Sequence, residues 1–469
     1  HKKYLTFKNR IVMIGCGSIG SGTLPLILRH FDISPDQITV ITADERGHEE
    51  AKKYGVEFIN HALTKENYRS VLDNRLSSGD FLVNVSVDVS CVDMMTLCQE
   101  KGALYIDTVV EPWGGYYLDS SLTASQRSNY ALREDMLKLK KKYPNGATAV
   151  SCHGANPGMV NHFVKQALLD VARDTGVKTT TPTSREGWGQ LAETLGIKVI
   201  HIAERDTQVS SKPKEVDEFV NTWSIDGFFS EGSQPAELGW GTHEKALPPD
   251  GNKHDFGSDA AIYLNRPGCT TRVRSWTPLE GPYQGFLITH NESISIADYL
   301  TLRDGAKVRY RPTCHYAYHP CDDAVLSLHE LNGKNGIQQS RQRLMVDEII
   351  KGMDELGVLL MGNKKGVYWY GSRLTMDQTR KLVPNNNATS LQVTIAVLSG
   401  MIWAIENPKC GIVEPEEMDF ARVLEIATPY LGDVVGVWGD WSPLQNREKL
   451  FKEDLDKSDP WQFKNIRVA

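Results

Sequence analysis

The sequence predicts an α/β protein that combines a doubly wound parallel sheet with a second α/β domain, built on a mixed or antiparallel sheet. Three observations carry this prediction. Strand-like apolar runs alternate with helical patterns through the first third of the chain. A glycine-rich turn directly follows the first of these runs. From residue 199 onward, the strand-like runs no longer alternate strictly with helices, which is typical of mixed or antiparallel sheets.

The glycine-rich turn lies in the stretch IVMIGCGSIGSG at residues 11–22. Its glycines separate an apolar run from a helical pattern at residues 23–30, which is the spacing of a Rossmann-type dinucleotide-binding turn. The first glycine allows a tight turn, the second lets the backbone approach a pyrophosphate, and the third lets helix and strand pack closely. Glycines that serve packing alone are the alternative. The expected cofactor contacts are Gly15, Gly17, Ser18, Ile19 and Gly20.

The first domain should alternate strands and helices along the chain. Strands are expected at residues 11–14, 38–41, 81–87, 104–109 and 147–151, and helices at residues 24–29, 49–54, 68–76, 92–101 and 130–142. Because open α/β sheets bind ligands at the carboxyl ends of their strands, the residues that follow these strands are candidate contacts.

Polar side chains follow several of these strands. The second strand ends at Thr42, where an acid usually binds the ribose hydroxyls, and the acid comes later at Asp44. Arg46 is close behind, so the residues leave open whether the cofactor is NAD or NADP. The stretches at residues 83–88 and 107–113 follow the next two strands. The further expected cofactor contacts are Asp44, Ser86, Asp88 and Thr108.

The stretch GANPGM at residues 154–159 precedes an amphipathic run at residues 160–172. Pro157 suits a first helical turn and Asn156 suits the N-cap before it. Asn156 is therefore either a capping residue or a ligand contact, and the sequence leaves both open.

The second domain is predicted from strand-like runs at residues 199–203, 216–223, 285–289, 308–318 and 367–370. Loops are expected at residues 179–188, 226–240 and 248–282, which are rich in polar residues, glycine or proline. A long apolar helix at residues 391–406 should pack back on the first domain or form a subunit contact, and the tail from residue 430 should cover the surface. The expected domains are residues 1–153, 154–385 and 386–469, the last packing on the first.

Several acids lie beside aromatic residues at strand ends. Glu111, Glu204 and Glu231 each follow or end an apolar run, and Trp223 ends another. Carboxylates pair with ammonium groups, and an indole face attracts a cation. A nicotinamide site with this lining suggests an amine substrate. His290, which precedes Glu292 closely, is either a general base or a core histidine with satisfied hydrogen bonds.

The stretch CHYAYHPC at residues 314–321 has two histidines with flanking cysteines, as some metal sites do. Its interleaved aromatic residues fit a buried strand better, so we expect a strand here and no metal.

The bulk composition is that of an ordinary globular protein. The chain has 469 residues and a net charge of −7, which argues against nucleic-acid binding and mildly favours cationic partners. No apolar run approaches the length of a membrane span, so no membrane partner is expected. The eight cysteines are scattered, as expected for reduced thiols in a cytoplasmic protein.

Taken together, these stretches resemble the bacterial homospermidine synthase family. The resemblance runs from the glycine turn to DPWQF at residues 459–463. The motifs that carry it are IGCGSIG (14–20), YIDTVVEPW (105–113), GANPGM (154–159), IHIAERDT (200–207), NTWS (221–224), QPAELGW (234–240) and THNESIS (289–295). The resemblance implies a saccharopine dehydrogenase-like fold, a homodimer, and a transferase that uses tightly held NAD.

The resemblance also implies a reaction in three stages. NAD⁺ takes a hydride from putrescine, a second putrescine attacks the imine with loss of ammonia, and the new imine is reduced to homospermidine. Related polyamines such as spermidine are implied as alternative donors. By resemblance, Glu204, Trp223 and His290 take part in catalysis, and the substrate contacts are Glu111, Asn156, Glu231, Trp223 and Glu292.

Two other functions compete with this interpretation. An NAD(P)-dependent dehydrogenase of the saccharopine or carboxynorspermidine type would bind substrate carboxylates and would need arginines where this chain offers acids. A non-catalytic dinucleotide sensor would need neither the acids nor the tryptophan.

Overall fold

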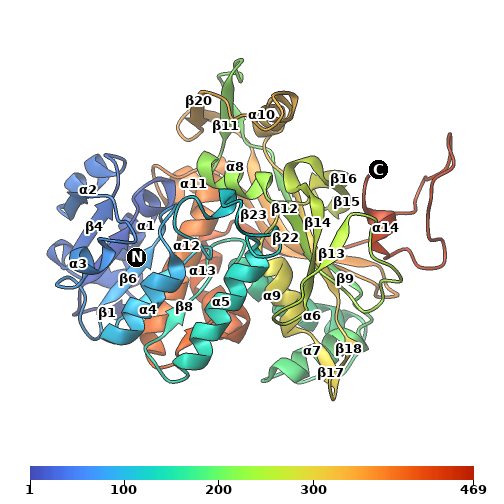
Figure 1. The fold of residues 1–469 in the computed structure, drawn as a ribbon, viewed down its shortest axis with the longest axis horizontal. Coiled ribbons are helices and arrows are strands. Elements are labelled where there is room, and N and C mark those ends of the chain that lie inside the picture. The colour runs from blue at the N-terminus through green and yellow to red at the C-terminus, as the bar shows by residue number, and fades with distance from the viewer. The chain divides into compact units, whose positions relative to one another are not determined.

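The computed structural model describes all residues, 1–469, and the chain forms two compact units (Figure 1). The first unit comprises residues 1–159, 222–227 and 377–431, and the second comprises residues 160–221, 228–376 and 432–469. The chain crosses from one unit to the other within the helices α6 (Met159–Asp174), α8 (Ile225–Ser233) and α11 (Met376–Leu382) and at two further points. Both units are therefore discontinuous in the sequence.

The first unit is built on a seven-stranded parallel sheet in the order β24-β8-β7-β6-β2-β4-β5. Its strands are β2 (Ile11–Ile14), β4 (Ile38–Thr42), β5 (Glu57–Asn60), β6 (Phe81–Asn84), β7 (Leu104–Asp107), β8 (Ala149–Val150) and β24 (Ile412–Val413). In chain order the first three strands run outward from the centre and the next three run outward on the other side, which is the Rossmann arrangement. The predicted doubly wound parallel sheet is confirmed.

Six helices of the first unit fall where the sequence predicts them, with shifted ends. They are α1 (Ser18–His30), α2 (His48–Tyr54), α3 (Tyr68–Leu72), α4 (Cys91–Lys101), α5 (Asn129–Lys142) and α12 (Ala388–Glu406). A further helix, α13 (Phe420–Ala427), was not predicted. Helix α1 begins at the serine inside the glycine turn, because glycine at its N-terminus leaves the backbone free to enter the helix early.

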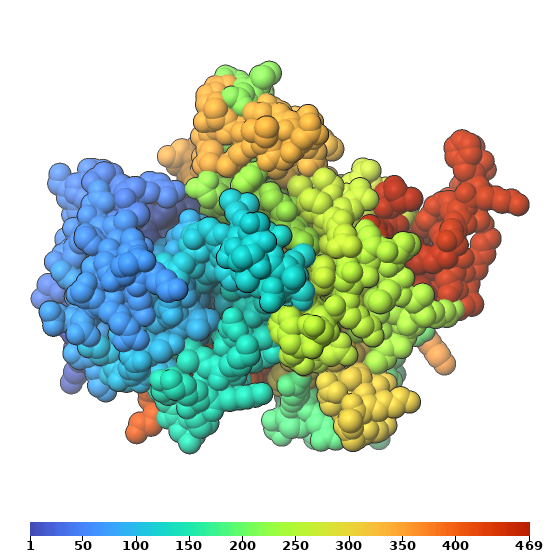
Figure 2. Space-filling model, in the orientation of Figure 1, coloured from blue at the N-terminus to red at the C-terminus, as the bar shows by residue number.

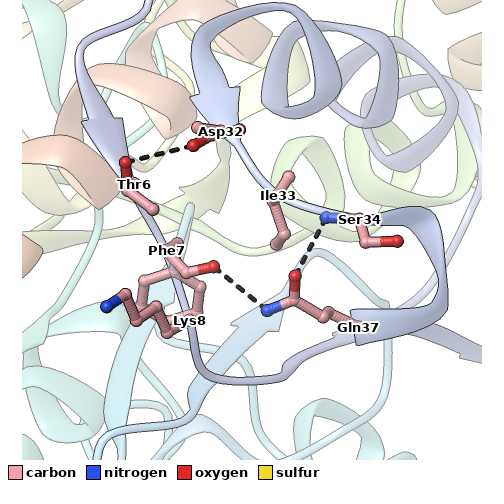
Figure 3. Close-up of a pocket in the computed structure, with 7 residues that line it drawn as sticks. All are labelled: Thr6, Phe7, Lys8, Asp32, Ile33, Ser34 and Gln37. Atoms are coloured by element: carbon pink, nitrogen blue, oxygen red, sulfur yellow. Dashed lines mark hydrogen bonds between the residues drawn. The ribbon is translucent and has the colours of Figure 1, made fainter.

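A shallow depression lies beside the short strands β1 (Leu5–Thr6) and β3 (Phe31–Asp32) of the first unit (Figure 3). Gln37 spans it, donating to the carbonyl oxygen of Phe7 over 3.0 Å and accepting from the Ser34 amide over 2.9 Å. This depression is at the amino end of β2, whereas the glycine turn follows the carboxyl end of that strand. It is therefore separate from the predicted cofactor site.

Helix α12 is mostly apolar. By length and composition alone it could cross a membrane, but 89 % of its most apolar window is buried within the protein. It packs on α1, β7 and α13. The helix is thus a core element of the first unit, as expected for residues 391–406.

The second unit is built on a ten-stranded mixed sheet with the order β13-β14-β12-β19-β9-β22-β23-β25 and a hairpin, β15–β16, that joins at β19. Its strands are β9 (Val199–Asp206), β12 (Pro235–Gly239), β13 (Gly251–Lys253), β14 (Ala261–Pro267), β15 (Arg272–Thr277), β16 (Gly281–Phe286), β19 (Thr313–His319), β22 (Met353–Met361), β23 (Val367–Thr375) and β25 (Asp433–Gly439). Strands β19 and β9 are parallel and the other pairs are antiparallel. The predicted mixed sheet is confirmed.

The remaining elements of this unit cover the large sheet or extend from it, and α9 (Asn291–Tyr299) packs directly on β12 and β19. The helices are α7 (Arg185–Thr194), α9 (Asn291–Tyr299), α10 (Asp322–Gly333) and α14 (Phe463–Ile466). Small two-stranded sheets pair β10 (Val209–Ser210) with β21 (Ile349–Lys351), β11 (Glu218–Asn221) with β20 (Arg341–Leu344), and β17 (Leu302–Asp304) with β18 (Lys307–Tyr310). In Figure 1, β11, β20 and α10 lie together away from the large sheet.

Two predicted loops are wrong, and a third, at residues 179–188, is correct only as far as residue 184. Residues 185–188 begin α7, residues 226–240 contain most of α8 and all of β12, and residues 248–282 contain strands β13, β14 and β15. Glycine and proline are frequent in these stretches, but pairing with neighbouring strands outweighs local preference. Strand β19 is present where CHYAYHPC predicts it, and the Nδ1 atoms of His315 and His319 each bond a backbone carbonyl oxygen.

Of the residues 386–469 that the sequence placed with the first unit, residues 386–431 belong to that unit, whereas the tail from residue 432 belongs to the second. Strand β25 pairs with β23, and Phe463 and Ile466 join the apolar core of the large sheet. Between these anchors the chain projects outward, and Leu450 and Phe451 are 87 % and 80 % exposed. Figure 2 shows this protruding segment in red.

Candidate functional site

The glycine turn of the first unit has the geometry that a dinucleotide requires. Gly15 has a φ of 88°, and a Cβ atom there would lie 2.9 Å from the Cα of Ser86. A Cβ atom on Gly20 would lie 2.5 Å from the Gly15 carbonyl oxygen, so α1 packs closely on the turn. Around Gly17 no atom lies within 4 Å of that position, so one side of the turn is open.

The N-terminus of α1 is uncapped. Gly17 is its N-cap and offers no side chain, and the first turn contains no acid. Backbone N–H groups at a helix N-terminus, together with the helix dipole, bind anions such as phosphate. Ser18 and Ile19 are only partly buried, so their N–H groups are available. These residues fit a pyrophosphate.

Asp44 and Arg46 follow β4 and bind each other. The Arg46 guanidinium donates to the Asp44 carboxylate over 2.7 Å, and this hydrogen bond holds the pKa of Asp44 below its usual value. Asp44 is therefore ionised and can accept from ribose hydroxyls, while Arg46 is already paired. The structure thus gives Arg46 a partner other than the 2′-phosphate of NADP.

A hydrogen bond from a backbone amide to a carboxylate links the segments that follow β6 and β7. Ser86 donates to the side-chain oxygen of Asn84 over 2.7 Å, and the Asp88 amide donates to Oε1 of Glu111 over 3.2 Å. Burial raises the pKa of Asp88, and the nearby charge of Asp226 raises it further. The predicted contacts Ser86, Asp88 and Glu111 therefore lie on one edge of the parallel sheet.

The turn that contains Asn156 packs beside the carboxyl end of β7. The Asp107 carboxylate accepts from the Cys152 amide over 2.5 Å, and burial raises the pKa of Asp107 to about 7. A Cβ atom on Gly154 would lie 3.4 Å from that of Thr108, so this turn packs against the strand end.

Asn156 is not a helix cap. Helix α6 begins only at Met159, and residues 154–158 form a tight turn in which the Gly154 amide donates to the Pro157 carbonyl oxygen over 2.7 Å. The prediction of a cap is wrong because this turn, and not the helix, follows Asn156. The buried Nδ2 atom of Asn156 has no hydrogen-bond acceptor within the protein. That orphaned donor favours the alternative, a ligand contact.

Trp223 lies in the segment 222–227 of the first unit. Asn387, at the N-terminus of α12, donates to the Thr222 carbonyl oxygen over 2.6 Å, and Oγ of Ser224 accepts from the Gly227 amide over 3.1 Å. Asp226, three residues after Trp223, is close enough to Asp88 to influence its pKa. The segment that carries Trp223 is thus anchored near predicted cofactor contacts.

In the second unit, His290 lies between two carboxylates. Its Nε2 atom is 2.9 Å from Glu231 and its Nδ1 atom is 3.1 Å from Glu292, which is fully buried. Burial alone would lower the pKa of His290, but the charges of Glu292 and Glu231 outweigh burial and raise it well above its usual value. His290 is therefore an imidazolium whose two N–H groups are both used. This arrangement favours the satisfied histidine over a free general base.

Glu204 lies on β9 near the same histidine. It accepts a hydrogen bond from the Tyr316 hydroxyl and shares another with Asp354. Burial raises the pKa of Glu204 to about 7, although both hydrogen bonds lower it. A carboxyl group that titrates near neutrality is suited to exchange a proton with an amine.

Residue reasoning from the sequence missed Tyr316 and Asp354. Strand β19 pairs with β9 in parallel so that Tyr316 is opposite Ile202, and Asp354 on β22 is opposite Asp206. Alternation along each strand then places these side chains on the face that carries Glu204. Only the register of neighbouring strands reveals this, and the sequence does not supply it.

The predicted residues divide between the two units. The first contains Gly15, Gly17, Ser18, Ile19, Gly20, Asp44, Ser86, Asp88, Thr108, Glu111, Asn156 and Trp223, and the second contains Glu204, Glu231, His290 and Glu292.

Comparison with known proteins identifies the relatives of the chain. Residues 11–150 match the family model of the saccharopine dehydrogenase NADP binding domain, and residues 154–440 match that of the saccharopine dehydrogenase C-terminal domain. The homospermidine synthase of Blastochloris viridis is 58 % identical over 98 % of this chain and 97 % of its own length. The homospermidine synthase of Mesorhizobium japonicum is 55 % identical over 98 % and 96 %.

The chain belongs to the homospermidine synthase family.

A solved structure agrees with this assignment to the homospermidine synthase family. The homospermidine synthase of Legionella pneumophila, determined in complex with NAD, has a TM-score of 0.93 and 51 % sequence identity to this chain. The match covers 99 % of this chain and 98 % of the solved one. Both predicted groups therefore lie within a fold that a homospermidine synthase shares over its full length.

Proposed function

We propose that this protein is an NAD-dependent homospermidine synthase that transfers an aminobutyl group between two putrescines. One observation carries the proposal: identity of 55–58 % to homospermidine synthases over 98 % of the chain. The proposed reaction oxidises one putrescine to an imine, exchanges its amine for that of a second putrescine with loss of ammonia, and reduces the product. Related polyamines are proposed as alternative substrates.

The first unit offers the residues that would hold the cofactor. The uncapped N-terminus of α1, with Gly17, Ser18 and Ile19, would bind the pyrophosphate, and Asp44 would accept from a ribose hydroxyl. Ser86, Asp88 and Thr108 would line the ends of the neighbouring strands. Bound NAD supplies a hydride acceptor and then a hydride donor. Because the cofactor would be regenerated in each cycle, tight binding serves the reaction.

The group around His290 is proposed to hold an ammonium group of the substrate. Glu231 and Glu292 carry two negative charges and His290 carries one positive charge, so the group is net negative. Glu231 is the most exposed of the three and is the proposed direct contact. Glu292 is fully buried, so its proposed role changes from substrate binding to fixing His290.

Glu204 is proposed to accept and return the proton of the reacting amine. An amine must be neutral to attack an imine, and a carboxyl group with a pKa near 7 can take its proton at neutral pH. Trp223 is proposed to stabilise the cationic intermediate with its indole face. Glu111 is proposed to anchor an ammonium group, and Asn156 to donate its unpartnered N–H to a ligand.

A dehydrogenase that binds substrate carboxylates is the competing function, since both matched domain families are named after saccharopine dehydrogenase. Such an enzyme needs arginines at its substrate contacts. The residues around His290 are acids, which supports an amine substrate.

The decisive experiment incubates the purified protein with putrescine and less NAD⁺ than protein. Homospermidine in excess of the added cofactor is the expected result. Stoichiometric release of NADH would support the dehydrogenase instead, and the absence of any product would support a sensor.

We further propose a cytoplasmic homodimer, as the family resemblance implies. All eight cysteines are unpaired, and seven are buried, which is consistent with a reducing compartment. Light scattering coupled to size-exclusion chromatography measures the proposed dimer mass directly.

A further inference from the structure

Tyr316 connects the two acidic groups of the second unit. Its side chain is 2 % exposed on β19, and its hydroxyl donates to Oε2 of Glu204. Its ring centroid is 4.5 Å from that of His290, which lies between Glu231 and Glu292. One buried side chain therefore touches both the proposed proton acceptor and the histidine bound to Glu231, the proposed ammonium contact.

We propose that Tyr316 is a positioning residue that fixes the Glu204 carboxylate through its hydroxyl and supports His290 through its ring. The inference rests on the proposed function, because it assigns a purpose to the orientation of Glu204. It adds a residue that neither the sequence motifs nor the proposed reaction singled out.

Neighbouring aromatic rings hold the side chain of Tyr316 in place. Tyr318 stacks on it with ring centroids 4.9 Å apart and an interplanar angle of 15°. On its other side Tyr318 contacts Phe228 at 5.7 Å, and Phe228 contacts Phe219 at 6.0 Å. A ring packed in this column cannot swing without displacing its neighbours, so its hydroxyl is preorganised toward Glu204.

Charged and titratable groups from several elements surround Glu204. Asp354 on β22 hydrogen-bonds to it, Asp206 on β9 raises its pKa, and His290 lowers it. Tyr283 on β16 is also within electrostatic reach. The Tyr316 hydroxyl donates to the Glu204 carboxylate, and this hydrogen bond favours the ionised form of Glu204. Removal of the hydroxyl must therefore raise the pKa of Glu204, because burial and Asp206 then act with less opposition.

The test compares the full-length protein with Tyr316→Phe, which keeps the ring and removes the hydroxyl. The titration of Glu204 is read from infrared difference spectra against Glu204→Gln, and the pH profile of kcat/KM is measured with putrescine. We expect the carboxyl titration and the acidic limb of the profile to move upward together by about one pH unit. The loss of kcat/KM should be about tenfold below neutral pH and small above pH 9.

Tyr310→Phe is the matched control. The Tyr310 hydroxyl, on β18 of the same unit, donates over 2.7 Å to the main-chain carbonyl oxygen of Ile197, and its charged neighbour is Glu193 rather than Glu204, so the variant loses a comparable hydrogen bond. We expect the titration of Glu204 to stay at the wild-type value. An unmoved titration in Tyr316→Phe, or an equal shift in Tyr310→Phe, overturns the proposal.

A second variant keeps the test independent of folding. 3-Fluorotyrosine at position 316 makes the hydroxyl a stronger donor, so the titration should move downward, opposite to Tyr316→Phe; movement in the same direction overturns the inference. The infrared readout needs no turnover. Absence of homospermidine from the wild-type protein would therefore refute the proposed function alone, while the titration of Glu204 would still decide the role of Tyr316.

Discussion

At the residue scale, charge and burial decide what each side chain can do. Glu231 and Glu292 are both glutamates, but Glu292 is fully buried against His290 and Glu231 is partly exposed. Exposure therefore separates a residue that can reach a substrate from one that orients its neighbour. The family resemblance of the sequence implies that both acids contact the substrate, but their exposure depends on the fold.

Trp223 provides the first prediction at this scale. Trp223→Ala should retain bound NAD and lose most turnover, since a cation on an indole face gains about 0.5–2 kcal/mol, or up to roughly thirtyfold in rate. Trp223→Phe should lose less because it keeps a ring. Cofactor content and homospermidine formation are the two measurements. Unchanged turnover in Trp223→Ala would remove the indole from the mechanism.

Asp44 provides the second prediction at the residue scale. Asp44→Ala should weaken NAD binding about tenfold, by loss of a charged hydrogen-bond acceptor, and should strengthen NADP binding because Arg46 loses its partner. Calorimetric titration with each cofactor measures both effects. Arg46→Gln is the control and should leave NAD affinity near that of the wild type. An equal loss for both cofactors in Asp44→Ala would contradict the assignment.

At the element scale, α12 links the glycine turn to the segment of Trp223. A Cβ atom on Gly22 of α1 would lie 2.5 Å from Oδ1 of Asn386, so α1 and the start of α12 pack closely. Asn387 caps α12 by accepting from the Ser390 amide over 2.8 Å, and it also binds the Thr222 carbonyl oxygen. One residue therefore caps the start of a helix and anchors the segment of a proposed substrate contact.

Asn387→Ala should lower the free energy of unfolding by about 1–2 kcal/mol because the cap is lost. It should also reduce turnover, because the segment of Trp223 loses its anchor. Asn387→Ser keeps a capping oxygen but is too short to replace the amide. Urea denaturation of Asn387→Ser should show restored stability. An assay of homospermidine formation should show that its turnover stays low. Full recovery of both properties would show that the contact with Thr222 is dispensable.

The strands and helices differ in how well the sequence predicts them. The strands and helices of the first unit could be predicted because parallel strands are continuous apolar runs between periodic helices. The strands at residues 251–277 could not, since partners distant in sequence stabilise them and no local pattern encodes those partners. Asn156 shows the same limit: its residue type suits a cap, but the chain turns before the helix begins.

At the scale of the whole molecule, the pH dependence of stability follows from buried ionisable groups. Burial lowers the pKa of His315 to about 4. Its pKa in the unfolded chain is about 6.5, so the unfolded state binds the proton first as the pH falls. The stabilisation that neutral His315 provides is present above about pH 6.5 and is lost as the pH falls through about 4.

His315→Gln should therefore reduce the loss of stability between pH 6.5 and pH 4 by an amount on the order of 3 kcal/mol. His329→Gln, at an exposed position on α10, is the control and should follow the wild-type curve. Urea denaturation across this range measures both. Parallel curves for His315→Gln and the wild type would refute the role of His315.

The tail offers a second prediction at this scale. Phe463 is 1 % exposed in the core of the large sheet, whereas Phe451 on the projecting segment is 80 % exposed. Phe463→Ala should cost about 3–5 kcal/mol, and Phe451→Ala should cost almost nothing. Chemical denaturation distinguishes them. A similar cost for both would mean that the tail contributes to stability in another way.

The discontinuity of both units has a consequence for biosynthesis. The first unit needs residues 377–431 and the second needs residues 432–469, so neither can close while the ribosome is still adding the earlier residues. Until these residues are synthesised, β8 lacks its neighbour β24 and β23 lacks its neighbour β25, and unpaired strand edges are prone to aggregation. We therefore expect the nascent chain to carry this hazard until its last segments are added.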